Sequence, residues 1–457
     1  MSASDTRRRH GGPVDDLARW LDDRLRLAEG SKKYLNKAFP AHWSFLLGEV
    51  ALFSLVVLLF TGTFLALFYT PDARLVVYDG PYAPLQGMEI SAAYESTLRL
   101  SFEVRAGLLM RQIHHWAALV FVAAIVAHML RVFFTGAFRK PRELNWVIGV
   151  ALLLLAFGAG FTGYSLPDDL LSGTGLRIGY SVVLGIPFIG PLLGFLLLGG
   201  EYPGTDTISR LHIAHVMLIP AGLLALLGAH LAILMRQKHT HKPSNLARED
   251  NVVGEPLFPS QTLTTLSLGA FTIAVLSLLG GLFEINPVWL YGTYEPYEVF
   301  APAQPDWYMG WTEGLVRLWP AWEWTILGVT LPSTFLPAVG IGGLIFTVMF
   351  AWPWIDRRWV GRDDFEHHLL ERPRDNPLRT GIGVAALTLM AVIFVAGSND
   401  VIASNLTMGL QTLTNLLRLA CFVLPPIAGY VAYRLAWSLK RSETSVEAAA
   451  ATRSGSD

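Results

Sequence analysis

Cysteine is almost absent from this sequence. The 457 residues include a single cysteine, Cys421, which lies in an apolar stretch near the end of the chain. One cysteine cannot form a disulfide within the chain, and no C-x-x-C-H motif is present for covalent haem attachment. A cluster of cysteine ligands for an iron–sulfur centre is also missing. Any haem here must therefore be held without a covalent link, and any other redox centre must belong to another subunit.

Charged residues are scarce as well. Only 16% of the residues are charged, whereas 52% are apolar, and the mean hydropathy is +0.42. The net charge of −1 gives no reason to expect a nucleic-acid partner. Residues 1–40 are polar and contain nine Lys and Arg, so we expect the first apolar run to be a retained span, not part of a signal peptide. This composition indicates an integral membrane protein.

Long apolar runs predict an all-α membrane protein with eight transmembrane helices. Each run has about the length needed to cross about 30 Å of hydrocarbon. The N-terminal segment and every second connection after it hold 26 Lys and Arg, while the intervening loops hold six. The positive-inside rule therefore places both termini in the cytoplasm. The predicted helices are 43–69, 106–134, 144–165, 209–236, 262–284, 332–354, 380–397 and 410–437.

Two pairs of histidines are the most informative feature of the spans. His114 and His128 lie 14 residues apart in the second run, and His215 and His230 lie 15 apart in the fourth. Fourteen helical positions return to within about 40° of the starting face and rise about 21 Å, and fifteen give about 60° and about 22 Å. Both helices are predicted to cross in the same direction, so the pairs meet at an outer and an inner level. Because neutral imidazole is a common axial ligand of haem iron, we predict two non-covalent b haems in a bundle of the first four helices.

Two other histidines compete for these positions. The interval from His115 to the inner histidine of its helix turns the two rings to nearly opposite faces. The interval from His212 to the inner histidine of its own helix aligns the faces but separates the two residues by about 27 Å. Neither interval matches the spacing of the histidine pair on the neighbouring helix, so neither His115 nor His212 is chosen as a ligand. Pro220 lies in the fourth run and is able to distort the phase of that helix.

Glycines and arginines support the haem interpretation. Two glycine pairs in the first and third runs repeat the spacing of the first histidine pair, which suggests gaps where flat macrocycles press against backbone. The alternative is ordinary packing of small residues between helices. Arginines near the histidines are able to bind haem propionates, although an arginine at a helix end also anchors at the interface. The residues are Gly48, Gly62, Gly149, Gly163, Arg111, Arg131 and Arg210.

The segment 285–331 is unusual for a loop. It is rich in Trp, Tyr and Pro and carries few charges, which suggests a partly buried lid on the outer side. A carboxylate and a phenol near the outer haem would bind a quinol and accept its proton. An aromatic belt at the interface is the alternative. The candidate catalytic residues are Asp306, Tyr308 and Glu313, and the candidate quinol site comprises Pro305, Asp306, Trp307, Tyr308 and Thr312.

The remaining segments allow a division into domains. We expect an N-terminal segment 1–40, a dihaem domain 41–240, a four-helix domain 241–440 that carries the outer loop, and a disordered tail 441–457. Residues 14–27 have apolar side chains at helical spacing, which indicates an amphipathic helix on the cytoplasmic surface or a partner-docking helix. Lys238, His239 and His241, together with His367 and His368, lie in cytoplasmic loops. We interpret them as a solvated face, with proton delivery to an inner quinone site as the alternative.

Together these features resemble cytochrome b of the bc1 complex, a quinol:cytochrome c oxidoreductase, over nearly the whole chain. The four glycines, His114, His128, His215 and the two arginines of the second run fall at the spacings of that family. Residues 163–167 resemble its G-Y-x-L-P motif, which adds Tyr164 to the quinol site, and residues 305–308 resemble its P-E-W-Y motif. The stretches RQIHHWAALVFVAAIVAH, GYSLPDDLLSGTGLR and WTEGLVRLWPAWEW are similar to the actinobacterial form.

Three positions depart from the family pattern. Asp306 stands where the family has glutamate, and its side chain is one methylene shorter. Asp168 and Asp169 stand where the family has Trp-Gly. The wider histidine spacing in the fourth run is that of the b6 branch, yet four further helices are fused to this chain. No cysteine lies near the first run, so the extra covalent haem of that branch is not expected.

The resemblance implies the function and the partners. Quinol, menaquinol in the actinobacterial form, would be oxidised at an outer site, and electrons would pass through two b haems to an inner quinone site, contributing to the proton gradient. A Rieske iron–sulfur subunit, a dihaem cytochrome c subunit, a homodimeric complex in the bacterial cell membrane and association with a terminal oxidase are also implied. The residues leave open a dihaem anchor of a dehydrogenase or hydrogenase, or a proton-coupled transporter. The P-D-W-Y loop and the nearly uncharged later runs argue against both.

Overall fold

The computed structural model describes residues 12–25, 35–40, 42–298, 300, 304–326, 328–359 and 365–454. Within these ranges, eight helical segments are long and apolar enough to cross a membrane, which confirms the predicted fold class. Helices are expected because a lipid environment offers no water to hydrogen-bond free backbone groups. The spans are α3 (Leu47–Ala66), α5 (Gly107–Phe134), α6 (Glu143–Tyr164), α9–α10 (Thr207–Gln237), α11 (Thr262–Leu282), α13 (Gly342–Trp359), α14 (Pro377–Ala396) and α16 (Leu410–Ser454).

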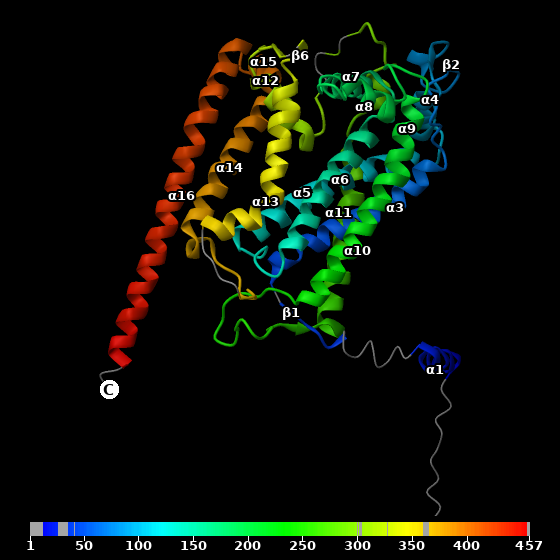
Figure 1. Ribbon diagram of the computed structural model, residues 1–457. Helices are drawn as coiled ribbons and strands as arrows, with labels where there is room; N and C mark the ends of the chain where they lie inside the picture. Colours follow the sequence, from blue (N-terminus) through cyan, green and yellow to red (C-terminus); the bar gives the residue numbers. More distant parts are fainter. Residues whose placement is uncertain are drawn as a thin grey trace, which may run out of the picture.

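The first four spans form one bundle (Figure 1). Helix α3 packs along α5, and α6 packs along α10. Their facing sides are apolar, and Val122 on α5, Val150 on α6 and Leu223 on α10 are each at most 2% exposed. All four histidines of the two pairs lie on helices of this bundle, which falls within the predicted dihaem domain 41–240.

The fourth span is not a continuous α-helix. It consists of α9 (Thr207–Ile213), a π-helical segment η3 (Ala214–Leu218) and α10 (Ile219–Gln237). Pro220 lies in the first turn of α10. Because proline lacks a backbone N–H, a locally widened turn before it is a common way to accommodate it. The distortion that the sequence suggested is therefore present, and the distorted segment includes His215.

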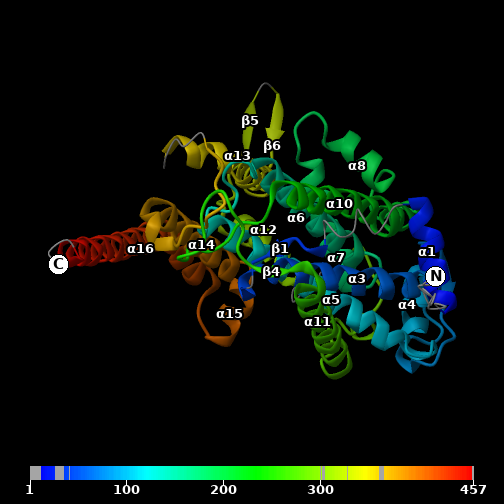
Figure 2. The same ribbon diagram turned by 90° about the horizontal axis from the view of Figure 1, so that it is seen from below.

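The other spans surround this bundle. Helix α11 packs against α3 and α5, α13 packs against α6, and α14 packs along α16 at one side of the molecule (Figure 2). Two of these spans also begin with π-helical segments, η4 (Leu257–Gln261) before α11 and η7 (Leu336–Ile341) before α13. The prediction of a disordered tail over 441–457 was wrong for residues 441–454, because helix α16 continues to Ser454. The last three residues lie outside the described part of the chain. Four consecutive alanines, 448–451, favour helix over coil there.

The connections at one end of the bundle contain short elements. They cover the end at which α5 begins and α6 ends, and they include most of the segment 285–331 (Figure 1). The helices are α4 (Ala92–Phe102), α7 (Leu170–Leu184), α8 (Gly190–Leu198), α12 (Gly310–Leu318) and α15 (Asn399–Asn405), with single turns η2 (Ala83–Leu85), η5 (Val288–Leu290) and η6 (Trp307–Met309). The hairpins pair β2 (Leu75–Val77) with β3 (Glu89–Ser91) and β5 (Trp324–Ile326) with β6 (Val329–Leu331), both antiparallel.

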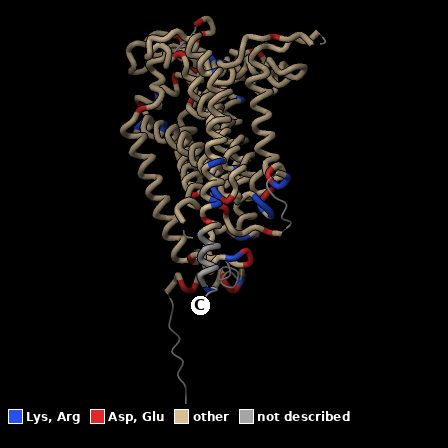
Figure 3. Tube along the Cα trace, turned by 90° about the vertical axis from the view of Figure 1, so that its left-hand side faces the viewer, with Lys and Arg blue, Asp and Glu red and all other residues tan. Residues whose placement is uncertain are grey.

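Positive charge gathers at the opposite end, where α5, α10, α13 and α16 finish (Figure 3). We call this the basic end. It also carries the antiparallel pair of β1 (Ala38–Phe39) and β4 (Glu255–Pro256), and the turns η1 (Trp43–Phe45) and η8 (Pro373–Asp375). The N-terminal helix α1 (Pro13–Leu25) exposes Val14 and Leu17. It covers most of the amphipathic helix predicted over 14–27, of which residues 26 and 27 lie outside the described part.

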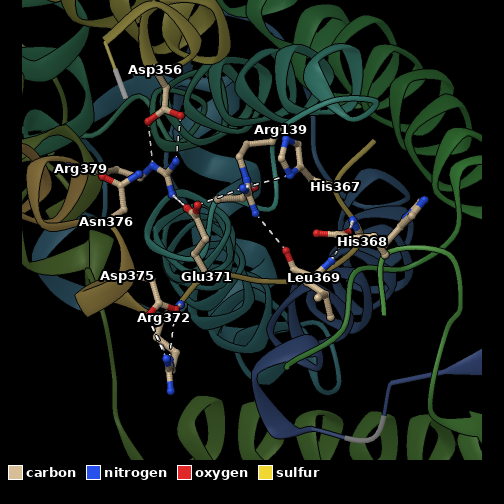
Figure 4. A network of polar contacts seen from close by, with 12 residues as sticks. Arg139, Asp356, His367, His368, Leu369, Glu371, Arg372, Asp375, Asn376 and Arg379 are labelled. Atoms are coloured by element: carbon tan, nitrogen blue, oxygen red, sulfur yellow. Dashed lines mark hydrogen bonds and ion pairs between the residues drawn. The ribbon is translucent and has the colours of Figure 1, made fainter. Parts of the chain in front are cut away.

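A buried polar network joins the two halves of the chain at the basic end (Figure 4). Arg379, whose side chain is 1% exposed, donates to both carboxylate oxygens of Asp356 at 2.8 Å and also pairs with Glu371. Glu371 in turn accepts a hydrogen bond at 3.0 Å from Arg139, in the loop between α5 and α6. Arg139 also donates to the carbonyl of Leu369. The α5–α6 loop is thereby held against the connection between α13 and α14.

This network yields a stability prediction. Arg379→Ala leaves the buried carboxylate of Asp356 without its cation, which should lower the free energy of unfolding by about 3–5 kcal/mol. Arg372→Ala, which removes a half-exposed arginine from the same connection, should cost less than about 1 kcal/mol. Thermal inactivation of the purified protein in detergent compares the two. Equal losses of stability would contradict the assignment of the buried pair as the stronger contact.

Candidate functional site

The outer histidine pair is brought together by α5 and η3. The ring centroids of His114 and His215 are 6.1 Å apart, with the rings at 70° to each other. The Nδ1 atom of His215 is 3.0 Å from the carbonyl oxygen of Ala159 and so carries the proton. The Nδ1 atom of His114 is 2.9 Å from the Thr61 hydroxyl, which donates its own proton to the Val57 carbonyl and therefore accepts from the ring. In both rings the proton is on Nδ1, so the lone pair of Nε2 is available to a metal. Hydrogen-bond partners of this kind commonly orient histidines that bind metals.

The inner pair lines a cavity. His128 and His230 face a space of about 400 Å³ that also borders Gly149 and Arg131. Among the described residues, no group hydrogen-bonds to the buried Nδ1 of His128 or to the buried Nε and Nη2 of Arg131. Unsatisfied polar groups of this kind are costly inside a membrane protein unless a ligand completes them. Two imidazoles and a cation around an apolar cavity fit a haem with its propionate.

The predicted glycines lie against the histidine rings. A Cβ atom on Gly48 would be 3.3 Å from His128, one on Gly62 would be 3.1 Å from Cε1 of His114, and one on Gly163 would overlap His215. Gly149 has nothing within 4 Å of such an atom and borders the inner cavity. Three of the glycines therefore leave room beside His114, His128 and His215, as the spacing that the glycines share with the first histidine pair suggested.

The π-helical segment explains the unequal spacing of the two pairs. A π-type turn closes its hydrogen bond over one residue more than an α-type turn, so it takes up one extra residue. The interval from His215 to His230 contains most of η3, and it is one residue longer than the interval between the two histidines of α5. The two helices therefore present their histidines at matching depths. Single π-type turns in helices are frequent at functional sites.

The three arginines have different positions. Arg111 donates to the carbonyl of Asn286 at 3.1 Å and retains a buried Nε without a described partner. Arg131 lies over the ring of Phe45 and faces the inner cavity. Arg210, in contrast, donates to the carbonyls of Phe195 and Leu196 at the end of α8. Helix ends leave such carbonyls unsatisfied, so the guanidinium of Arg210 is used there and is not directed to the outer histidines.

The predicted quinol site contains a residue that the sequence reasoning had set aside. The Nε2 atom of His115 is 2.8 Å and 3.0 Å from the two carboxylate oxygens of Asp306. Tyr308 donates its hydroxyl proton to the same carboxylate at 3.1 Å. His115 adjoins His114 on α5, so its position next to the outer pair could be read from the sequence. Its contact with a loop in the other half of the chain could not.

Packing holds Tyr308 in this position. It is 2% exposed, its ring stacks with that of Phe157 at 6.2 Å between centroids, and its hydroxyl occupies the space beside Gly160. Burial, reinforced by the neighbouring Asp306 carboxylate, raises the pKa of Tyr308 well above its usual value. The phenol is therefore a hydrogen-bond donor, and Asp306 is the group of this pair that can accept a proton.

The other candidate residues lie around this centre. Glu313 pairs with Arg317 on α12, and burial raises its pKa. Trp307 is 38% exposed and adjoins Phe394, while Tyr164 donates to the carbonyl of Leu171 and is near enough to Asp306 to interact with its charge. Pro305 and Thr312 flank the central residues in sequence and are partly buried.

The two aspartates that replace Trp-Gly have a structural role. Asp169 caps the first turn of α7, and its carboxylate accepts from the backbone N–H of Ser172 at 3.1 Å. Burial raises the pKa of Asp169 to about 6, although Arg111 nearby opposes the shift. Asp168 adopts a left-handed backbone conformation with φ of 56°, which aspartate tolerates better than most residues.

The loop histidines at the basic end are not solvated, so that interpretation was wrong. Their exposed fractions run from 2% to 9%. His241 and Leu369 form a parallel bridge, with the His241 N–H donating to the His368 carbonyl at 2.9 Å. Arg142 contacts the Nδ1 of His368 at 2.8 Å. The loops bury each other, which a count of polar residues does not reveal. The buried residues are His239, His241, His367 and His368.

Comparison with known proteins decides the family. The cytochrome b subunits of the bc1 complexes of Corynebacterium efficiens and Mycobacterium tuberculosis are 47% and 49% identical to this chain over 93% of its length, which covers 78% and 77% of theirs. The chain belongs to the cytochrome b family of the bc1 complex. The same subunit of Streptomyces coelicolor is 45% identical over 93% of the chain and 78% of that protein, so the actinobacterial resemblance is confirmed.

The other comparisons agree with this family. A family model described as cytochrome b (N-terminal)/b6/petB matches residues 119–293. A solved chain of a hyperthermophilic respiratory complex III has the same fold, with a TM-score of 0.65 and 22% identity over 91% of this chain and 99% of that chain. This cytochrome b is thus an integral membrane subunit of a respiratory quinol:cytochrome c oxidoreductase, and its family binds haem b. A transporter or a dehydrogenase anchor is excluded by family membership.

The glycine contacts predict how haem binding responds to small changes. Gly163→Ala places a methyl group onto His215, which should displace that ring and lower the haem content of the protein. Gly228→Ala on α10 is the control, because a Cβ there meets nothing within 4 Å. Haem-to-protein ratios and reduced-minus-oxidised spectra of the two purified variants give the comparison. Full haem content in the Gly163 variant would contradict contact between this glycine and a ligand.

Proposed function

We propose that this cytochrome b holds two b haems at different depths of one bundle. His114 and His215 would hold the iron near the end that carries the α12 loop, and His128 and His230 would hold the iron near the basic end. The proposal is supported by the fixed proton positions on His114 and His215 and by the glycines beside the rings. Nitrogens of Arg111 and Arg131 that have no partner among the described residues would bind propionates. When bound, the two haems would supply electron carriers that together span the membrane.

The observation that carries the catalytic proposal is the His115–Asp306–Tyr308 cluster. Quinol must lose a proton from each hydroxyl as it loses its electrons, and a positioned carboxylate lowers that barrier. Asp306 accepts a quinol proton, while Tyr308 and His115 hold its carboxylate in place. The shorter side chain of aspartate is compensated by these two contacts. The donor that we propose is menaquinol, which the resemblance of the sequence to the actinobacterial form implies.

The orientation follows from the distribution of charge. The basic end would face the cytoplasm of a bacterial cell, with both termini on that side. Quinol oxidation near Asp306 would release protons outside, and reduction of quinone at the basic end would take protons from inside. Both reactions contribute to the proton gradient. An electron that moves inward works against about 2.3 kcal/mol per 100 mV of membrane potential, so the inner haem should have the higher reduction potential.

The proposed partners follow from the lack of cysteine ligands for an iron–sulfur centre in this chain. The chain has one cysteine, so the acceptor for the other electron of quinol belongs to a second protein. We propose a Rieske iron–sulfur subunit and a dihaem cytochrome c subunit, in a homodimeric complex that associates with a terminal oxidase. The complexes named for the relatives in the comparison contain a cytochrome b subunit by name and so consist of several proteins.

The number of haems is tested by removing one ligand at a time. His128→Ala or His230→Ala should abolish the inner haem and leave one haem per chain, because the outer ligands lie about 20 Å away along the helices. His115→Gln and His212→Gln should both retain two haems. Haem quantitation and low-temperature spectra of the purified complex measure this. One haem or none in well-folded wild-type protein would refute the proposal.

Quinol oxidation is tested at Asp306. Asp306→Asn keeps the shape and removes the base, so steady-state quinol oxidation should slow by about 10- to 100-fold with both haems still bound. Asp306→Glu, which restores the residue of the wider family, should keep most of the activity. Asp79→Asn, at an exposed position on the same side of the protein, serves as the matched control. A wild-type rate in Asp306→Asn would instead implicate Glu313.

A further inference from the structure

One buried carboxyl at the end of the bundle where α6 finishes lies outside the cluster around Asp306. Asp169 stands where the family has glycine, and it is 1% exposed. Its Oδ1 accepts from the backbone N–H of Ser172 at 3.1 Å and also from the Ser172 hydroxyl. Its Oδ2 is buried and has no hydrogen-bond partner among the described residues. A carboxylate oxygen buried without a partner is costly, so such a group tends to bind a proton.

An arginine beside the outer histidine pair has a matching unsatisfied group. Arg111 lies three residues before His114 on α5, which is about one helical turn. Its Nη2 donates to the carbonyl of Asn286 at 3.1 Å, while its buried Nε has no partner in the described part of the chain. The charges of Asp169 and Glu284 both act on this guanidinium. Arg111, the proposed partner of an outer-haem propionate, is therefore within electrostatic reach of the Asp169 carboxyl.

The segment that follows α11 contacts both groups. Its Asn286 carbonyl binds Arg111, and its Thr293 forms an antiparallel bridge with Asp169. Tyr291 lies between these two contacts in the sequence, and its phenol is close enough to interact with the charges of both Asp169 and Arg111. Backbone contacts of one short segment therefore set the positions of the carboxyl and the guanidinium relative to each other.

The other titratable groups that face Asp169 come from α4, α6 and the loop before α7. Tyr94 and Tyr164 supply two phenols, and Asp168 supplies a second carboxyl. Arg111 supplies the positive charge of this group. Burial raises the pKa of Asp169 to about 6, so near neutral pH one added charge in its surroundings changes how much of the carboxyl is protonated.

We propose that Asp169 binds a proton when the outer haem is reduced and releases it when that haem is oxidised. The inference rests on the proposed function, because it requires haem between His114 and His215. The carboxylate gains one proton from the solution outside as one electron from quinol reaches the iron. It loses that proton when the electron passes to the inner haem. The proton offsets a negative charge that poorly hydrated surroundings screen weakly, and a glycine at this position would not supply it.

The test is a redox titration of the purified complex at a series of pH values, followed by the absorption of the outer haem. Reduction should raise the affinity of Asp169 for a proton about tenfold. Because the reduced form binds the proton more tightly, the potential of the outer haem should fall as pH rises. A tenfold change in affinity corresponds to a total fall of about 59 mV, spread between about pH 5 and about pH 8 in wild type.

Two variants remove the carboxyl and keep the fold. Asp169→Asn should lose this fall and hold the potential at its acidic value, because the side chain is neutral at every pH. Asparagine caps a helix about as well as aspartate, so α7 should be retained. Asp169→Gly, which restores the residue of the wider family, should behave in the same way. A carboxyl infrared band that changes on reduction of the outer haem should be present in wild type and absent from both variants.

The matched control is the neighbouring acid. Burial raises the pKa of Asp168 to about 6 as well, but the groups that act on this carboxyl are Ser91 and Asp169. Asp168→Asn should therefore keep both the fall in potential and the infrared band. An unchanged fall in Asp169→Asn would overturn the inference, as would loss of the fall in Asp168→Asn or loss of the outer haem from both Asp169 variants. Absence of the outer haem from well-folded wild-type protein would instead refute the proposed function.

Discussion

Four neutral imidazoles must be held at two depths of one apolar bundle, and much of the structure serves this requirement. A span offers no water, so a ring whose protonated nitrogen is satisfied by protein is oriented with its other nitrogen available to a metal. Thr61 on α3 and Ala159 on α6 meet this need for the outer pair. The same two helices supply the glycines that leave room beside the rings. Helices α3 and α6 therefore form the walls beside the rings, whereas α5 and the α9–α10 span carry the four histidines proposed as ligands.

The two halves of the chain contact each other through polar side chains at both ends of the bundle. Near α12, the second half supplies Asp306 and the first half supplies His115. At the basic end, the second half supplies Gln261 and the first half supplies Glu49. Neither polar cluster would be complete in one half alone. The network around Arg379 also joins the two halves at the basic end.

Much of this arrangement could be predicted from the sequence because it is periodic. The eight spans, the histidine pairs and the glycines all follow from helical spacing and from the scarcity of charge. Contacts between distant loops have no such period. The bond from His115 to Asp306, the burial of His239 and the turn of Arg210 toward α8 depend on how connections fold over the ends of the bundle. Asp169 was visible only as a departure from the family motif, and its capping role required the position of α7.

The π-helical segment at Ala214–Leu218 also bears on how such a chain changes in evolution. Insertion or deletion of one residue in a regular membrane helix rotates everything beyond it by about 100° and would separate a ligand from its iron. A segment that already alternates between wide and regular turns absorbs the change locally. The gain of one residue in one turn would thus convert the shorter histidine spacing into the longer one of this chain, with both histidines left in place. A change of one residue in length is therefore accommodated in this segment with less displacement of the histidines than in the regular helices of the bundle.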